Sequence, residues 1–376
     1  MMGSPAGAAV RLPTAARADV VAAGKRLYYL DNLRVGLVML VIAHHVGQAY
    51  GPTGGYWPIM ETARAAILGA FFTVNRSFFM SLFFMISGYF TVMSFEAAGA
   101  RRFVESRLLR LGLPVLWWAL AMIPMQVLVF KRAAWPVDIG HLWFIEHLLI
   151  YSLVFALWRV VRDRRAAAGP RGAGRLLNPP GPLPIVGLAL LIALVSGIVR
   201  TWYPIDRWVI LFGFLKVAWA DVPRDLAFFI AGLLAYRNEW FRTFPARAGL
   251  AWLGVGLAAS LLWVAYASGL MGAPLPWTVV SASLPFQIWE GVLCCGLGIG
   301  LTVLFRERLN RGGRLTRAMG QAQYAAYIWH VPIVLLCQLA VLSLPLPPLV
   351  KFGLVTVAAI PLSFLFARLV RRPLRL

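Results

Sequence analysis

YYLDNLRVGLVMLVIAHHVGQAY, residues 28–50, is apolar enough to enter a membrane, yet it carries the ionisable side chains Asp31, Arg34, His44 and His45. Ionisable groups inside a membrane-spanning helix are costly, so they usually face the interior of a helix bundle or a wet cavity. The stretch therefore predicts a transmembrane helix that carries part of a functional site.

The spacing of Arg34 and His45 places both on one face of this helix. They are eleven residues apart, which is about three turns plus 20° of rotation and about 16 Å along the axis. His44 is turned about 80° away from that face. An arginine and a histidine that reach toward opposite leaflets suit a site spanning half the bilayer. The structural alternative is a snorkelling arginine and two histidines that are hydrogen-bonded inside the bundle.

The composition predicts an all-α, polytopic integral membrane protein. Of the 376 residues, 60% are hydrophobic and only 13% are charged, which excludes an ordinary soluble domain. Apolar runs of about 20 residues predict about ten transmembrane helices. The ten predicted spans are 28–50, 77–95, 107–130, 141–161, 183–200, 222–236, 248–270, 281–305, 321–343 and 349–369. The apolar run 207–219 is too short to cross easily and is expected to be an interfacial or re-entrant segment.

The basic residues predict the orientation of these spans. With the N-terminus inside, 26 of the 36 Lys and Arg residues fall on the inner side and 9 on the outer side, while Arg34 lies within the first span. The positive-inside rule then places both termini in the cytosol. The net charge of +22 does not indicate nucleic acid, because the basic residues cluster in alternate loops. Residues 1–27 are expected to be a disordered cytosolic tail, 28–370 a single transmembrane domain, and 371–376 a second cytosolic tail.

The third span begins with FVESRLLRLGLP, which places Arg107 and Arg110 on one helical face at the cytosolic entrance. Two guanidinium groups on one face form a fork for phosphate or carboxylate. Pro114 follows and predicts a kink that opens backbone groups. The alternative interpretation is that both arginines only anchor the helix by the positive-inside rule.

The fourth span begins with HLWFIEHLLIY, which places His141 at the external mouth and Glu146 and His147 deeper. A buried carboxylate needs a partner, and one close to a histidine suggests acid–base chemistry. The alternative is that His141 is an interfacial residue and that Glu146 pairs with a structural arginine.

The ninth span contains GQAQYAAYIWHVPIV, which places His330 about 13 Å from the cytosolic face, ahead of Pro332. The alternative is a core histidine bonded to a carbonyl that the proline frees. In the second span, SLFFMISGYF, the small residues Ser81, Ser87 and Gly88 are expected to permit close helix packing.

These motifs together resemble the integral membrane acyltransferase type-3 family. Arg34 and His45 are similar to its Arg-ten-residues-His motif, FFMISGYF to its second-span signature, and Arg107 and Arg110 to its paired-arginine motif. HLWFI, FFIAGLLAY and YAAYIWHVPI follow in the family's order, so the resemblance covers about 28–336. The nearest branch is that of the osmoregulated periplasmic glucan succinyltransferases. The chain departs from the family pattern at its end, where Arg-Arg-Pro stands in place of Glu-Arg-Pro, and Glu146 matches no family motif.

The resemblance implies an O-acyltransferase in a bacterial plasma membrane. It would move an acyl group of the acetyl or succinyl class from cytosolic acyl-CoA to a hydroxyl of a glycan or another acceptor at the external face. Arg107 and Arg110 would hold the donor's phosphates, Arg34 would assist them or polarise the thioester, and His45 would be the base or the acyl carrier.

The remaining candidate catalytic residues are His141, Glu146 and His330. No metal is expected, because the cysteines lack the spacing of a zinc site. The competing interpretation is a transporter of an anionic solute that uses Arg34, Arg107 and Arg110 as its substrate site. Repeated halves would favour a transporter, but the sequence has no clear internal symmetry.

Overall fold

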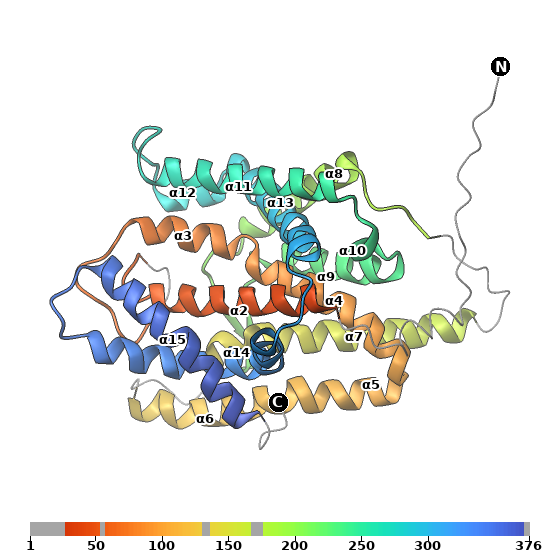
Figure 1. Cartoon of the computed structure of the whole chain (residues 1–376), viewed down its shortest axis with the longest axis horizontal. Helices are drawn as coiled ribbons and strands as arrows, with labels where there is room; N and C mark the ends of the chain where they lie inside the picture. The colour runs from red at the N-terminus through yellow and green to blue at the C-terminus, as the bar shows by residue number, and fades with distance from the viewer. Residues whose placement is uncertain (1–26, 53–56, 130–135, 167–175, 372–376) are drawn as a thin grey trace.

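The computed structural model of this chain describes residues 27–52, 57–129, 136–166 and 176–371. The predicted tail at residues 1–27 lies outside the described residues except for Leu27, and the C-terminal tail does so beyond Arg371. The described chain is a bundle of α-helices with one two-stranded hairpin (Figure 1). It is therefore an all-α, polytopic membrane protein, as the composition predicts.

Each of the ten predicted spans coincides with helical structure. In chain order these spans are α2 (Tyr28–Gly47), α4 (Phe79–Ala98), the run α5 (Ala100–Arg107), η1 (Leu108–Gly112), α6 (Leu113–Pro124) and η2 (Met125–Val129), then η3 (Gly140–Leu142) with α7 (Trp143–Ala166), α8 (Pro182–Arg200), α9 (Val222–Arg237), α11 (Ala246–Ala267), α13 (Leu284–Arg308), α14 (Arg314–Val341) and α15 (Pro348–Val370). Within the described chain, eight helical stretches are long and apolar enough to cross a membrane. α2 and α9 are not among them, because α2 carries several polar side chains and α9 has only 16 residues.

The remaining elements are short and connect the spans. The helices are α3 (Ile67–Arg76), α10 (Trp240–Thr243) and α12 (Trp277–Ala282). The strands β1 (Val209–Leu211) and β2 (Leu215–Val217) form an antiparallel hairpin. The run 207–219 is thus not a further span, as expected, and it is a hairpin rather than a helix. The sequence did not predict α3, which leads directly into α4.

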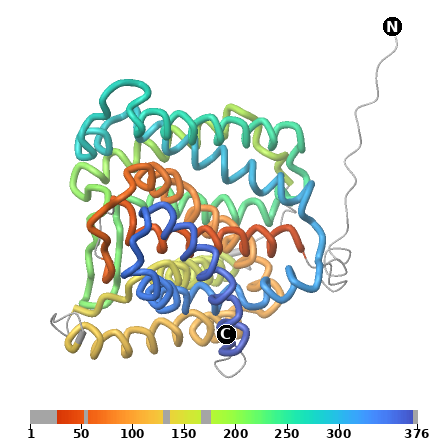
Figure 2. The backbone as a smooth tube through the Cα atoms, turned by 60° about the vertical axis from the view of Figure 1, so that its left-hand side comes forward, coloured from red at the N-terminus to blue at the C-terminus, as the bar shows by residue number. Residues whose placement is uncertain are grey.

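Helix α2 runs through the middle of the bundle. In both Figures 1 and 2 it lies between α11 on one side and the α5–α6 run on the other. Its buried side chains point in several directions, with Leu30, Leu33, Val41 and Ile42 at most 2% exposed. A helix that is apolar on every side is stable only when other helices surround it. The ionisable side chains of α2 therefore lie inside protein and not against lipid.

Glycine pairs set the closest helix contacts. A Cβ atom at Gly232 of α9 would lie 1.9 Å from the carbonyl oxygen of Met85 in α4, and one at Gly88 would lie 2.2 Å from the carbonyl oxygen of Phe229 in α9. Because lipid offers no hydrophobic drive for helix association, such close backbone packing holds membrane helices together. The prediction that Gly88 permits close packing is therefore confirmed.

Candidate active site

A cavity of about 500 Å³ lies within the helix bundle. It is lined from α2, α4, α5, the η1 turn, α7 and α14, and its basic residues are Arg34, Arg107 and Arg110. The sequence therefore predicted correctly that these three arginines come together. We call this space the arginine cavity; its other lining residues are Val38, Phe83, Ser87, Phe90, Ser94, Leu111, Phe144, Ile145, Leu148, Gln323, Tyr324 and Tyr327.

Within the described part of the chain, the guanidinium groups of Arg107 and Arg110 form no ion pair with a carboxylate, whereas Asp31, on the same helix, acts on the charge of Arg34. The guanidinium carbon of Arg34 lies 5.8 Å from the ring centroid of Phe90, and that of Arg107 lies 4.8 Å from the ring centroid of Phe103. The Nε atom of Arg107 is buried and has no hydrogen-bond partner. Cations held against aromatic faces, without a carboxylate, leave their positive charge available to an anionic ligand.

The backbone around Arg110 is a π-helical turn, η1, in place of the kink predicted from Pro114. Proline has no N–H group, so the carbonyl of the residue four positions earlier loses its helical donor. That residue is Arg110, and its carbonyl accepts a 2.5 Å hydrogen bond from the Tyr324 hydroxyl of α14. Single π-helical turns are frequent at functional sites. Here the turn and Tyr324 together fix where Arg110 lies.

Three histidine side chains from three helices meet at the far end of α2. The ring centroid of His330 lies 4.8 Å from that of His45 and 4.8 Å from that of His141, while those of His45 and His141 are 6.1 Å apart. We call these three residues the histidine cluster. His330 lies beside His45, sixteen residues and about 24 Å after α14 begins at Arg314. The depth of His330 below the cytosolic face stays a prediction.

The hydrogen bonds of the cluster fix which ring nitrogen of His45 is free. A carbonyl oxygen can only accept, so His330 Nδ1, 2.7 Å from the carbonyl of Tyr327, must carry its proton, and His330 Nε2 is left as an acceptor. His45 Nδ1 lies 2.9 Å from the carbonyl of Val41 and 3.2 Å from His330 Nε2, so it donates to both. The lone pair of His45 is therefore on Nε2, where it can accept a proton.

A second proline organises His141. Pro332 leaves the carbonyl of Ile328 without its helical donor, and His141 Nε2 donates to that carbonyl at 3.0 Å. The Tyr327 hydroxyl donates to the carbonyl of His141 at 2.5 Å. The alternative for His330 was a hydrogen bond to the carbonyl that Pro332 frees. That alternative is wrong, because His141 makes this bond and His330 bonds the carbonyl of Tyr327 instead.

Tyr327 lies between the arginine cavity and the histidine cluster. Tyr327 lines the cavity, and its ring centroid lies 5.7 Å from that of His141 and 5.8 Å from that of His330. A ligand held by the arginines would therefore reach toward the histidines along α14.

His44 is turned to another side of α2, as its rotation on the helix predicts, although its ring centroid lies 5.9 Å from that of His45. Its ring contacts Phe72 and Phe79, with centroid distances of 5.0 Å and 5.2 Å. Burial does not distinguish the two neighbouring histidines, since both are only partly exposed. Only His45 belongs to the histidine cluster.

Glu146 lies outside the histidine cluster. Its carboxylate accepts a 3.0 Å hydrogen bond from the backbone N–H of Lys216, and His147 Nε2 lies 3.2 Å from the carbonyl of the same residue. The alternative that Glu146 pairs with an arginine is wrong, because its carboxylate bonds this backbone N–H group instead. Both side chains hold strand β2 against α7.

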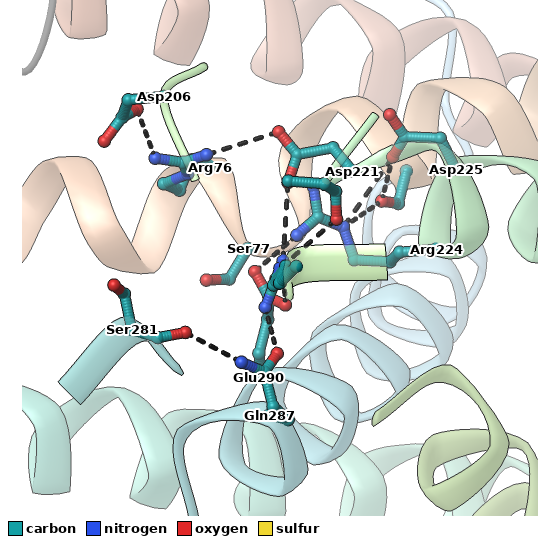
Figure 3. Close-up of polar contacts among 12 residues, drawn as sticks. Arg76, Ser77, Asp206, Asp221, Arg224, Asp225, Ser281, Gln287 and Glu290 are labelled. Atoms are coloured by element: carbon teal, nitrogen blue, oxygen red, sulfur yellow. Dashed lines mark hydrogen bonds and ion pairs between the residues drawn. The ribbon is translucent and has the colours of Figure 1, made fainter. Parts of the chain in front are cut away.

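A second buried cluster of charge went unrecognised in the sequence (Figure 3). Glu290 of α13 lies 2.7 Å from Arg200 of α8 and 2.5 Å from Arg224 of α9. Arg224 Nε donates to the Ser81 hydroxyl at 2.9 Å, and this hydroxyl donates to Asp225 at 2.6 Å. The prediction that Ser81 serves helix packing is thus incomplete. We call the set the outer ion network; its members are Arg76, Ser81, Arg200, Asp206, Asp221, Arg224, Asp225 and Glu290.

The outer ion network pairs its charges internally. Burial alone would raise the pKa of Asp221, but Arg224, Arg76 and Arg200 together lower it to about 2. The carboxylate is therefore ionised at neutral pH. The signal that was missed is Glu290, a lone acid inside a predicted span, which needs a buried cation as its partner.

Comparison with known proteins gives the same family that the motifs resemble. Residues 27–368 match the family model described as "Acyltransferase domain". Over 267 residues the chain is 27% identical to "Glucans biosynthesis protein C" of Salmonella schwarzengrund, covering 65% of this chain and 68% of that protein. The protein of the same name from Shigella dysenteriae serotype 1 is 28% identical over 263 residues, covering 64% and 66%. No solved structure matches. The chain therefore belongs to the membrane acyltransferase type-3 family and is an O-acyltransferase.

Proposed function

We propose that this enzyme transfers an acyl group of the acetyl or succinyl class from an acyl-CoA in the arginine cavity to a hydroxyl of a glycan or another acceptor. The observation that carries the proposal is that Tyr327 both lines the arginine cavity and packs against His141 and His330 of the histidine cluster. A glycan acceptor is supported by the printed name of the relatives, which concerns glucan biosynthesis.

The phosphates of coenzyme A are the ligand that best suits the arginines. Guanidinium groups bind phosphate oxygens in pairs, and unpaired guanidiniums need an anion. Arg107 and Arg110 would hold the phosphates, while Arg34, deeper on α2, would assist them or polarise the thioester. A volume of about 500 Å³ is within the usual range of small-molecule sites.

In the proposed reaction His45 acts as a general base. Its Nε2 lone pair takes the proton of the acceptor hydroxyl while the hydroxyl oxygen attacks the thioester carbonyl carbon. The C–S bond then breaks, and the coenzyme A sulfur leaves with the proton from the imidazolium. His330 Nε2 and the carbonyl of Val41 hold His45 in the required tautomer. The alternative is that Nε2 itself carries the acyl group. Donor labelled in its acyl group and given without acceptor would label the protein at His45 only in that case.

The proposed orientation places both termini in the cytosol of a bacterium and the histidine cluster toward the external face of its plasma membrane. Twenty-six of the basic residues then lie inside, in accord with the positive-inside rule. Reporter fusions at Leu376 and near Gly272 should report inside and outside respectively. An outside signal at Leu376 would contradict the orientation, and with it the cytosolic entry of the donor.

The neighbouring histidines offer the test of the proposed base. His45→Ala and His45→Gln should each lower turnover by about 10²–10⁴-fold, which is the usual contribution of general base catalysis. Glutamine keeps a hydrogen-bonding side chain but cannot take the proton. His44→Ala should cost far less, since its ring lies among phenylalanines.

The measurement is acyl transfer by each purified variant at several pH values, with thermal unfolding as the control for folding. If the His45 variants turn over at nearly the normal rate, or if His44→Ala is equally inactive, His45 is not the base.

A further inference from the structure

Gln323 is a polar side chain of the arginine cavity that has no partner. It lies on α14, is 6% exposed and lines the cavity. Its Oε1 atom is buried and accepts no hydrogen bond within the described residues. Nearly all buried polar groups are hydrogen-bonded, so an orphaned amide oxygen on a residue that lines a cavity calls for a partner.

The other uncharged polar side chains that α14 contributes to the cavity are already engaged. The Tyr324 hydroxyl donates to the carbonyl of Arg110, and the Tyr327 hydroxyl donates to the carbonyl of His141. Gln323 is thus the α14 side chain that remains available to a ligand. It is an amide, which can donate and accept at the same time.

The position of Gln323 selects which part of a ligand it meets. It precedes Tyr324, which contacts the backbone of Arg110, and it lies one helical turn before Tyr327, which contacts the histidine cluster. On the facing helix α4, Ser87 and Ser94 also line the cavity and lie seven residues apart, on one helical face. The cavity wall therefore carries uncharged polar side chains beside its arginines.

We propose that Gln323 pairs with an amide of the pantetheine arm of acyl-CoA. Its Oε1 accepts the N–H group of that amide, and its Nε2 donates to the carbonyl. This inference rests on the proposed function, since it takes acyl-CoA as the donor. It assigns the arginines to the phosphate end of the donor and Gln323 to the neutral arm that leads to the thioester.

Two ligands separate the contribution of Gln323 from that of the arginines. Coenzyme A has both phosphates and the pantetheine arm, whereas 3′,5′-ADP has phosphates and lacks the arm. Gln323→Met, which keeps the length of the side chain, should weaken coenzyme A binding about 10-fold by removing two hydrogen bonds. It should leave 3′,5′-ADP binding unchanged. Arg107→Ala should weaken the binding of both ligands.

The matched control is Gln321→Met, on the same helix. Gln321 is exposed, and its side chain accepts a hydrogen bond from Arg371, so its loss should change neither affinity. Calorimetry on the purified full-length protein gives both affinities. If Gln323→Met fails to fold, the wild-type protein provides the second test. A coenzyme A analogue with an ester in place of each pantetheine amide should then bind more weakly than coenzyme A itself.

The outcomes separate this inference from the proposed function. If wild type binds neither ligand, the proposed donor is wrong and the role of Gln323 falls with it. If wild type binds coenzyme A but Gln323→Met binds it equally well, the inference alone is overturned. Equal loss of both ligands in Gln323→Met would also overturn it, because the effect would then not concern the arm.

Discussion

The outer ion network and the arginine cavity both bury arginines, but they treat the charge in opposite ways. In the network, Arg224 is 1% exposed and lies within ion-pair distance of Glu290, Asp221 and Asp225. In the cavity, Arg107 has no carboxylate partner among the described residues and lies over the ring of Phe103. The charges of the outer ion network are paired within the protein, whereas the charge of Arg107 in the cavity is available to an anionic ligand.

The difference shows how a structural arginine can be told from a functional one. An ion pair inside a membrane protein joins helices, and removing one partner leaves an uncompensated buried charge. An unpaired arginine that opens to a cavity adds repulsion to the empty protein and is useful only when an anion binds. The two regions should therefore respond oppositely to mutation, the network through stability and the cavity through ligand affinity.

The largest effect is expected from Glu290→Ala. The variant leaves Arg200 and Arg224 without their shared carboxylate, which should lower the free energy of unfolding by about 3–5 kcal/mol. Thermal unfolding in detergent measures the loss. The control is Asp206→Asn in the same network, because the pair of Asp206 with Arg76 is partly exposed and should contribute less than about 1 kcal/mol. Equal losses of unfolding free energy in the two variants would mean that the burial of an ion pair does not determine how much its removal destabilises the protein.

The second effect is expected from Arg107→Ala combined with Arg110→Ala. Each guanidinium–phosphate contact is a charge-assisted hydrogen bond of about 1.5–3 kcal/mol, so coenzyme A affinity should fall by at least about 10-fold for each arginine. The loss should shrink as salt is raised, and stability should stay unchanged. Arg102→Ala, an exposed arginine of α5 outside the cavity, is the matched control. Unchanged affinity in the folded double variant would assign these arginines to membrane orientation alone.

The smallest effect is expected from Tyr324→Phe. The variant removes the donor to the Arg110 carbonyl, a contribution of about 1 kcal/mol, and should weaken coenzyme A binding several-fold by releasing Arg110. Pro114→Ala restores a backbone N–H four residues after Arg110. In that background the Tyr324→Phe substitution should therefore cost less, and a double-mutant cycle on coenzyme A affinity measures the difference. If the effects of the two substitutions on coenzyme A affinity were strictly additive, the Tyr324 hydroxyl and the restored N–H group would not compete for the carbonyl of Arg110.

Most of the fold was predictable because apolar length and basic-residue distribution are properties of the sequence itself. The ten spans follow from runs of apolar residues. Helical rotation predicts that His45 and His44 face different surroundings. In the structure His45 contacts His330, and His44 contacts Phe72. What the runs do not contain is helix α3, which directly precedes α4, and the hairpin at 209–217, whose strands are three residues each.

The parts of the site that were not predicted depend on partners far away in the sequence. Glu290 meets Arg200 and Arg224 only because α8, α9 and α13 pack together. Tyr324 gains its role from a carbonyl 214 residues away. Periodicity within one helix cannot show such pairings. Individual histidines could be identified as candidates, but the contact that joins His45 to His330 could not.

The two carbonyls freed by proline also impose an order on how this protein can be assembled. Arg110 and His141 are synthesised early, whereas their partners Tyr324 and Ile328 both belong to α14, which enters the membrane late. Lipid offers no donor to a bare carbonyl. Each bond therefore closes only when α14 has docked beside α6 and α7, and a nascent chain that stops before Arg314 has neither. Translation of roughly the last sixth of the chain thus completes a candidate site whose first residue, Arg34, emerged near the beginning.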